Sequence, residues 1–213
     1  MDRYYPVFLR IKDKKCIVIG GGKVAARKTL GLLQDGGLVT VISPIISEEL
    51  QELASEGIVK WEQRQYQQGD VQTAFLVFAA TNSREVNRQV CFEAEQHGVL
   101  VNSIDDSSLC DFIVPARVDR GKLQIAISTS GASPALTKSI RQELESIFGD
   151  EYELFLDWMH TLRVWLLDNE QSEQHRRKIF HAAVQSPILT LLRQKRISEA
   201  KAIIHELVQE EIL

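Results

Sequence analysis

Strand-like and helix-like segments alternate along the first half of the chain. Short runs rich in apolar residues, typical of strands covered on both faces, occupy residues 16–19, 39–42, 58–61, 74–80 and 99–102. Helix-like spacing runs between them over residues 23–35, 47–57 and 83–96, and each of these segments ends at or just before a glycine. This alternation predicts a parallel sheet with helices on both faces, which is an α/β fold.

The pattern changes after residue 111. Strand-like runs at 112–118 and 123–128 flank Asp119-Arg120-Gly121, which predicts a β-hairpin. Ser133 as N-cap and Pro134 at the first helical position predict a helix that continues to about Phe148. Beyond it, apolar residues recur at helical spacing to the end of the chain, which predicts an all-helical segment with its own packed core.

Composition excludes several classes of protein. A chain of 213 residues with 44% apolar content is typical of a globular protein, and its formal net charge of -4 provides no general attraction for nucleic acid or an anionic membrane. No apolar stretch is long enough to span a bilayer, and the N-terminus lacks the apolar segment of a signal peptide, so we expect a cytoplasmic protein. Neither the three cysteines nor the five histidines show metal-ligand spacing, so we expect no protein-held metal.

The first strand leads into a glycine-rich turn that satisfies a dinucleotide-binding fingerprint, Gly20-x-Gly22-x-x-Ala25. Gly20 permits the sharp turn from strand to helix, Gly22 lets backbone amides approach a pyrophosphate, and Ala25 keeps the helix close to the sheet. The alternative is a turn with a purely structural role. The position between a strand and a helix favours dinucleotide binding.

The second strand departs from the fingerprint. A carboxylate for the adenosine ribose is expected about 20 residues after the first glycine, but the strand ends at Ser43-Pro44. Ser43 can hydrogen-bond one ribose hydroxyl, and Pro44 and Ile45 can pack against the adenine. No arginine follows the strand directly, which favours NAD over NADP as the cofactor.

Five strings together resemble the precorrin-2 dehydrogenase family, some of whose members are also sirohydrochlorin ferrochelatases. They are GGGKVAARK at 20–28, AATN at 79–82, VNSID at 101–105, FIVPA at 112–116 and STSGASP at 128–134. The resemblance implies a Rossmann-like NAD-binding domain at 1–113, a hairpin-and-helix dimerisation segment at 114–148 and a helical domain at 149–213. It also implies a homodimer that oxidises precorrin-2 with NAD to sirohydrochlorin, in sirohaem synthesis.

The resemblance also implies roles for individual residues. The catalytic aspartate of the family falls on Asp105, directly after the fifth strand. The cofactor positions of the family fall on Gly22, Lys23, Val24, Pro44, Ile45 and the region of Thr81.

Asp105 follows a parallel strand at its carboxyl end, where open α/β sheets bind their ligands. A carboxylate there can act as a general base in the oxidation, or stabilise positive charge on the pyrrole rings. The alternative is that Asp105 or Asp106 only ends the strand with an Asx-turn, and Asp111 adds a third carboxylate nearby.

A hydroxyl-rich loop precedes the helix that begins at Pro134. Precorrin-2 carries many carboxylates, so an acidic protein needs local donors to hold it. Loop and flanking residues predicted to bind the substrate are Ser128, Ser130, Gly131, Ser133, Arg117 and Lys138. The alternative is a well-capped helix with solvated surface charges.

The sequence is compatible with three functions. The first is an NAD-dependent precorrin-2 dehydrogenase, and the second adds chelatase activity with Fe²⁺ as a further substrate. The third is a regulatory module that senses NAD without chemistry. Asp105 and the hydroxyl-rich loop favour an enzyme, and the C-terminal segment shows no basic recognition helix.

Overall fold

The computed structural model describes residues 4–209 and 212. The chain divides into two compact units, with the boundary between Val114 and Pro115. Each unit has hydrophobic core clusters of its own.

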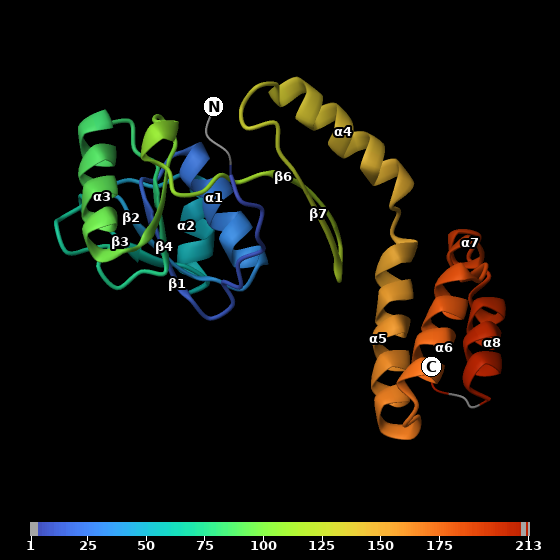
Figure 1. Ribbon diagram of the computed structural model, residues 1–213. Coiled ribbons are helices and arrows are strands. Elements are labelled where there is room, and N and C mark those ends of the chain that lie inside the picture. Colours follow the sequence, from blue (N-terminus) through green and yellow to red (C-terminus); the bar gives the residue numbers. More distant parts are fainter. Residues whose placement is uncertain (1–3, 210–211, 213) are drawn as a thin grey trace. The chain divides into compact units, whose positions relative to one another are not determined.

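The first unit alternates strands and helices in the order that the hydrophobic pattern predicts (Figure 1). Its elements are β1 (Lys15–Ile19), α1 (Lys23–Gln34), β2 (Leu38–Ile42), α2 (Glu48–Ser55), β3 (Lys60–Glu62), β4 (Leu76–Ala79), α3 (Arg84–His97), β5 (Leu100–Ser103) and the 3-10 helix η1 (Ser107–Leu109).

The five strands form one parallel sheet in the order β3-β2-β1-β4-β5. The predicted α/β fold is therefore confirmed. The chain crosses from one half of the sheet to the other between β3 and β4. The strands β1 and β4 are neighbours, but the chain continues from β1 toward β2 on one side and from β4 toward β5 on the other. Open sheets of this kind bind ligands at such a switch point, outside the carboxyl ends of the strands.

The core of the first unit lies on the two faces of the sheet. Residues from α1 and α2, such as Ala25 and Leu50, pack with one set of strand residues. Residues from α3, such as Val90 and Ala94, pack with the other set. Cys16 and Cys91 are buried free thiols within these clusters, as their apolar surroundings predict.

Several strands begin later than the hydrophobic pattern predicts, and hydrogen bonds explain two of these differences. The amides of Ile58 and Val59 both donate to the carbonyl of Leu53 and close the end of α2, so β3 begins only at Lys60. The first hairpin strand begins at Ala116 instead of Phe112. The carbonyl of Phe112 accepts a hydrogen bond from the Asn102 side chain, which ties this segment to β5.

The second unit begins with a β-hairpin and continues as helices (Figure 1). Its elements are β6 (Ala116–Arg120), β7 (Leu123–Ile127), α4 (Pro134–Ile147), α5 (Glu151–Asn169), α6 (Glu173–Gln185), α7 (Ile188–Arg193) and α8 (Ile197–Val208). The last four helices share one apolar core around Leu162, Leu166, Ile188 and Ile204. In the described part of the chain, every helix is too short or too polar to cross a membrane.

Candidate dinucleotide and catalytic site

The turn between β1 and α1 needs its first two glycines for reasons within the protein. Gly20 has a φ of +122°, and a Cβ placed on it would lie 2.3 Å from the carbonyl oxygen of Ala80. A Cβ on Gly21 would lie 2.0 Å from the carbonyl oxygen of Ile45. Both positions therefore exclude a side chain, and Gly21 is a constrained residue that the fingerprint alone did not single out.

Gly22 differs, because nothing in the protein requires a glycine there. Its φ is -81°, which any residue adopts, and a Cβ placed on it would meet no atom within 4 Å. Gly22 is the N-cap of α1, with no capping side chain and no acidic residue in the first turn. The first-turn amides of Lys23 and Val24 have no partner within their own helix. They therefore form a site suited to an anion.

The predicted adenosine contacts follow the end of β2. Ser43 is buried, and its hydroxyl donates to the carbonyl of Ile45 at 2.7 Å, so it can meet a ribose hydroxyl only as an acceptor. Pro44 is exposed, and Ile45 is 79% exposed. An exposed apolar pair at this position is suited to packing against the face of a planar base.

Asp105 lies just beyond the carboxyl end of β5, with an exposed side chain. The hydroxyl of Ser103 donates to its carboxylate at 2.5 Å. This hydrogen bond is the main reason that the pKa of Asp105 is lowered, and Asn87 and the charge of Arg84 act in the same direction. Asp105 is therefore an ionised carboxylate at neutral pH.

The neighbouring carboxylates have local structural partners instead. Asp106 accepts hydrogen bonds from the amide and the hydroxyl of Ser108 and so caps η1. Asp111 accepts a hydrogen bond from the amide of Val101 at 2.9 Å. The Asx-turn considered for either aspartate is therefore formed by Asp106, and the Asp105 carboxylate remains directed to the side chain of Ser103.

Asn87 on α3 is a candidate site residue that the sequence did not predict. Its side chain is fully buried, accepts from the amide and hydroxyl of Thr81, and donates to the carbonyl of Thr81. Thr81 follows β4, so Asn87 holds the end of the strand that borders the glycine turn. A polar residue on the buried face of α3 was the only sequence signal for this role.

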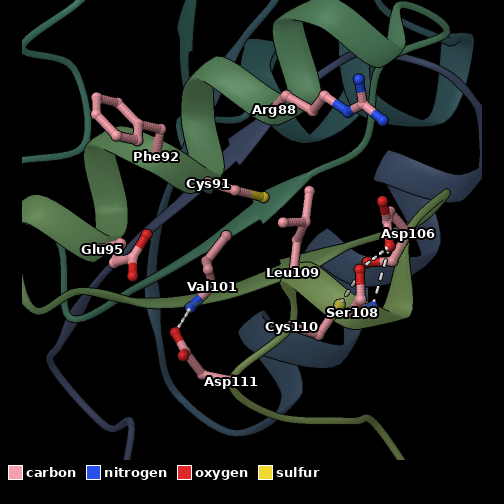
Figure 2. A pocket seen from close by; sticks show the side chains of 10 residues that line it. All are labelled: Arg88, Cys91, Phe92, Glu95, Val101, Asp106, Ser108, Leu109, Cys110 and Asp111. Carbon is pink, nitrogen blue, oxygen red and sulfur yellow. Dashed lines mark hydrogen bonds between the residues drawn. The ribbon is translucent and has the colours of Figure 1, made fainter.

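A cavity of about 660 Å³ lies between α3 and the segment that follows β5 (Figure 2). Arg88, Cys91 and Phe92 line it from α3, and Asp106, Leu109 and Cys110 line it from the other side. The hydrogen bonds from Ser108 are the main reason that the pKa of Asp106 is lowered, and the charge of the exposed Arg88 acts in the same direction. Charged side chains such as Arg88 and Asp106 line it together with apolar ones such as Leu109, and Asp106 directly follows Asp105.

The predicted substrate loop belongs to the second unit. Ser133 caps α4 by accepting a hydrogen bond from the amide of Leu136, as predicted. Ser128 accepts a hydrogen bond from the amide of Ser130, and both are exposed. Ser130 and Gly131 both have positive φ, at 50° and 82°.

The basic residues around this loop differ in their surroundings. Lys138 is exposed on α4, and Arg117 lies on β6 opposite Ala126. Lys122 and Arg141 form ion pairs with carboxylates of the same unit.

The segment that contains the glycine turn and the parallel sheet is similar to a known family. Residues 7–116, more than half of the chain, match the family model for NAD(P)-binding proteins. The chain belongs to this NAD(P)-binding family. Residues 120–147 of the NAD(P)-binding chain also match the model described as sirohaem biosynthesis protein, central.

Curated relatives of this NAD(P)-binding chain are siroheme synthases. That of Methylococcus capsulatus is 35% identical over 95% of this chain and 43% of its own length. Those of Xylella fastidiosa and Nitrosococcus oceani are 36% and 41% identical, over 97% and 70% of this chain and 44% and 32% of their own lengths. The chain therefore spans less than half the length of each of these relatives.

A solved structure extends the similarity over nearly the whole NAD(P)-binding chain. It is described as SirC, precorrin-2 dehydrogenase, and it matches with a TM-score of 0.81 and 28% identity, over 97% of this chain and 100% of the other. These matches confirm the family resemblance that the five sequence strings predict.

The geometry of the turn fits a dinucleotide. The amides of the α1 N-terminus and the open space at Gly22 provide an anion site, and the exposed pair Pro44 and Ile45 provides an apolar surface for a base. The turn therefore suits a nicotinamide cofactor of the NAD(P) type, which is the ligand of this family.

Proposed function

We propose that the chain is an NAD-dependent precorrin-2 dehydrogenase, which forms sirohydrochlorin for sirohaem synthesis. The proposal rests on two groups that lie at the same edge of the parallel sheet. The open N-terminus of α1 at Gly22 and the ionised carboxylate of Asp105 both lie at the carboxyl ends of the parallel strands. The similarity to a structure described as precorrin-2 dehydrogenase supports the same assignment.

The residues divide the chemistry between binding and proton transfer. NAD, when bound, supplies the acceptor for the hydride that leaves the substrate. The amides at Gly22, Lys23 and Val24 bind and orient the pyrophosphate, while Gly20 keeps the turn tight. Asp105 accepts the proton that the oxidation releases, and Ser103 holds its carboxylate in place through their hydrogen bond. Thr81, fixed by Asn87, lies directly beside the glycine turn.

The assignment of NAD in preference to NADP rests on the surroundings of β2. Ser43, Pro44 and Ile45 follow this strand and include no cation. Glu48 and Glu49 then form the first turn of α2, and both are exposed. Negative charge at this position disfavours the 2′-phosphate of NADP.

We also propose that the substrate carboxylates are held by the second unit. Ser128, Ser130, Gly131 and Ser133 supply hydroxyl and amide donors ahead of α4, and Arg117 and Lys138 supply positive charge. An acidic tetrapyrrole needs such donors, because the chain as a whole is negatively charged.

A second activity, iron chelation, is supported by the same carboxylate. The described residues contain no group of three His, Cys, Asp or Glu side chains arranged to hold a metal ion. In this reaction the tetrapyrrole nitrogens would hold the Fe²⁺ substrate, and Asp105 would accept their protons. The curated relatives are siroheme synthases, which favours testing this reaction.

We propose a homodimer formed through residues 114–148, with the helical domain at 149–213 beside it. Helix α4 has no buried residue, and Leu136 and Ile147 on it are 52% and 48% exposed. Apolar side chains that stay exposed on one helix suit burial against a second copy of the chain. Light scattering at micromolar concentration should give twice the 24.1 kDa of one chain, and Leu136→Glu should lower that mass. A monomeric wild type would remove this proposal.

We assign the protein to the cytoplasm, because Cys16, Cys91 and Cys110 are all free thiols, which suits a reducing compartment.

One assay separates the three functions. The protein is incubated with precorrin-2 and NAD⁺ and then with Fe²⁺, and the absorbance of each tetrapyrrole and of NADH is followed. A dehydrogenase forms sirohydrochlorin and NADH in equal amounts in the first step. A chelatase then forms sirohaem faster than a control without protein. Binding of NAD⁺ without any turnover would indicate the sensing module and contradict the proposal.

A further inference from the structure

The structure brings a carboxylate to the end of β2 from the neighbouring strand. Strand β3 pairs with β2 in parallel, with Glu62 opposite Ile42. The amide of Ser43, the first residue after β2, donates to the carbonyl of Glu62 at 3.2 Å. The Trp61 side chain also donates to the carbonyl of Ser43 at 2.9 Å. Glu62 therefore stands beside the position at which the fingerprint expects a ribose-binding carboxylate.

Glu62 belongs to a cluster of charged side chains at this edge. It forms ion pairs with Lys60 and Arg64, and its side chain is 26% exposed. Two nitrogens of Arg64 donate to the two carboxylate oxygens of Asp70, each at 2.8 Å. This bidentate pair and Glu62 together occupy the guanidinium of Arg64.

We infer that Glu62, with Arg64 held by Asp70, selects NAD over NADP at the adenosine ribose. This inference rests on the proposed function, because it concerns the cofactor of that same site. Glu62 supplies the carboxylate for a ribose hydroxyl that the end of β2 itself lacks. A 2′-phosphate would need an available cation at this edge, and the guanidinium of Arg64 is already bound to two carboxylates.

The charges of the cluster support this direction of selectivity. Glu62 and Asp70 carry two negative charges, while Arg64 and Lys60 carry two positive charges. The side chains of Glu62 and Asp70 are 26% and 12% exposed, whereas those of Lys60 and Arg64 are 71% and 34% exposed. Solvent therefore screens the positive charges more strongly than the negative ones. The pKa of Glu62 is lowered, first by the hydrogen bond from Lys60 and also by that from Arg64, so it stays ionised at neutral pH.

The test is the ratio of affinities for NAD⁺ and NADP⁺, measured by calorimetry on the full chain without substrate. Wild-type protein should bind NAD⁺ at least about tenfold more tightly, which corresponds to about 1.4 kcal/mol. Glu62→Gln keeps the size of the side chain and removes its charge. It should weaken NAD⁺ binding, strengthen NADP⁺ binding and reduce the ratio by about tenfold.

Two further variants separate this effect from a general change in charge. Asp70→Asn releases one side of Arg64 and should strengthen NADP⁺ binding with little change for NAD⁺. Glu56→Gln removes an equivalent charge at the C-cap of α2, at the opposite end of that helix, and should leave the ratio unchanged. Thermal unfolding of each variant checks that the fold is intact.

The outcomes distinguish this inference from the proposed function. A wild type that binds the two dinucleotides equally overturns both the role of Glu62 and the proposed preference for NAD over NADP, but leaves the proposed dehydrogenation of precorrin-2 intact. A Glu62→Gln ratio equal to that of the wild type overturns the role of Glu62 alone. Failure of the wild type to bind either dinucleotide overturns both.

Discussion

Alanine substitutions at Gly20 and Gly22 should separate folding from cofactor binding. At Gly20, a Cβ would lie 2.3 Å from the carbonyl oxygen of Ala80 in a backbone with a φ of +122°. The positive φ costs about 1–2 kcal/mol and the overpacking about 1–3 kcal/mol, so Gly20→Ala should lose about 2–5 kcal/mol of unfolding free energy. At Gly22 a Cβ meets nothing, so Gly22→Ala should cost less than about 1 kcal/mol.

The effect on cofactor binding should be separate from this. In Gly22→Ala, the new methyl group occupies the space through which a pyrophosphate approaches the amides of α1. An overpacking cost of about 1–3 kcal/mol in the complex corresponds to an affinity for NAD⁺ that is lower by roughly 5- to 150-fold. Urea unfolding measures the stability of both variants, and calorimetry measures the affinity of Gly22→Ala. A stable Gly22→Ala protein that binds NAD⁺ as tightly as the wild type would refute the assignment of this turn.

Of three further variants, two test the role of Asp105 and one tests a buried carboxylate that stabilises the first unit. Asp105→Asn should lower the turnover of precorrin-2 by at least about 100-fold while NAD⁺ affinity stays within about twofold; undiminished turnover would reject Asp105 as the proton acceptor. Ser103→Ala removes the main cause of the lowered Asp105 pKa, so that pKa rises and activity should decline at a higher pH on acidification than in the wild type; superimposable pH profiles would contradict this. Glu93 is a buried carboxylate that accepts hydrogen bonds from the amides of Gly69 and Val71 and from the hydroxyl of Tyr66. Glu93→Ala leaves these donors without their acceptor and should lower the free energy of unfolding in urea by about 3 kcal/mol or more. A loss below about 1 kcal/mol would show that Glu93 does not hold residues 66–71 in place.

The sequence predicts the features that depend on local interactions. The alternating strands and helices, the Ser133 cap and the turn at Gly20 each follow from residues close together in the chain, and each is confirmed. The position of Asp105 at a carboxyl strand end likewise follows from the strand before it.

Features that depend on sheet order and register could not be predicted in the same way. The sequence alone places no carboxylate at the end of β2, because Glu62 reaches that position through the pairing of β3 with β2. The constraint on Gly21 comes from the carbonyl of Ile45, which only the folded loop brings near. Asn87 has the sequence signal of an ordinary polar residue, and its role appears only when α3 packs beside the end of β4.

The most direct test of the account is a crystal structure of the protein soaked with NAD⁺. We expect the pyrophosphate on the amides that follow Gly20 and Gly22, the adenosine beside Ser43 and Ile45, and the nicotinamide facing the carboxylate of Asp105. A dinucleotide bound elsewhere while this turn stays empty, or an Asp105 carboxylate directed away from the nicotinamide, would contradict the account.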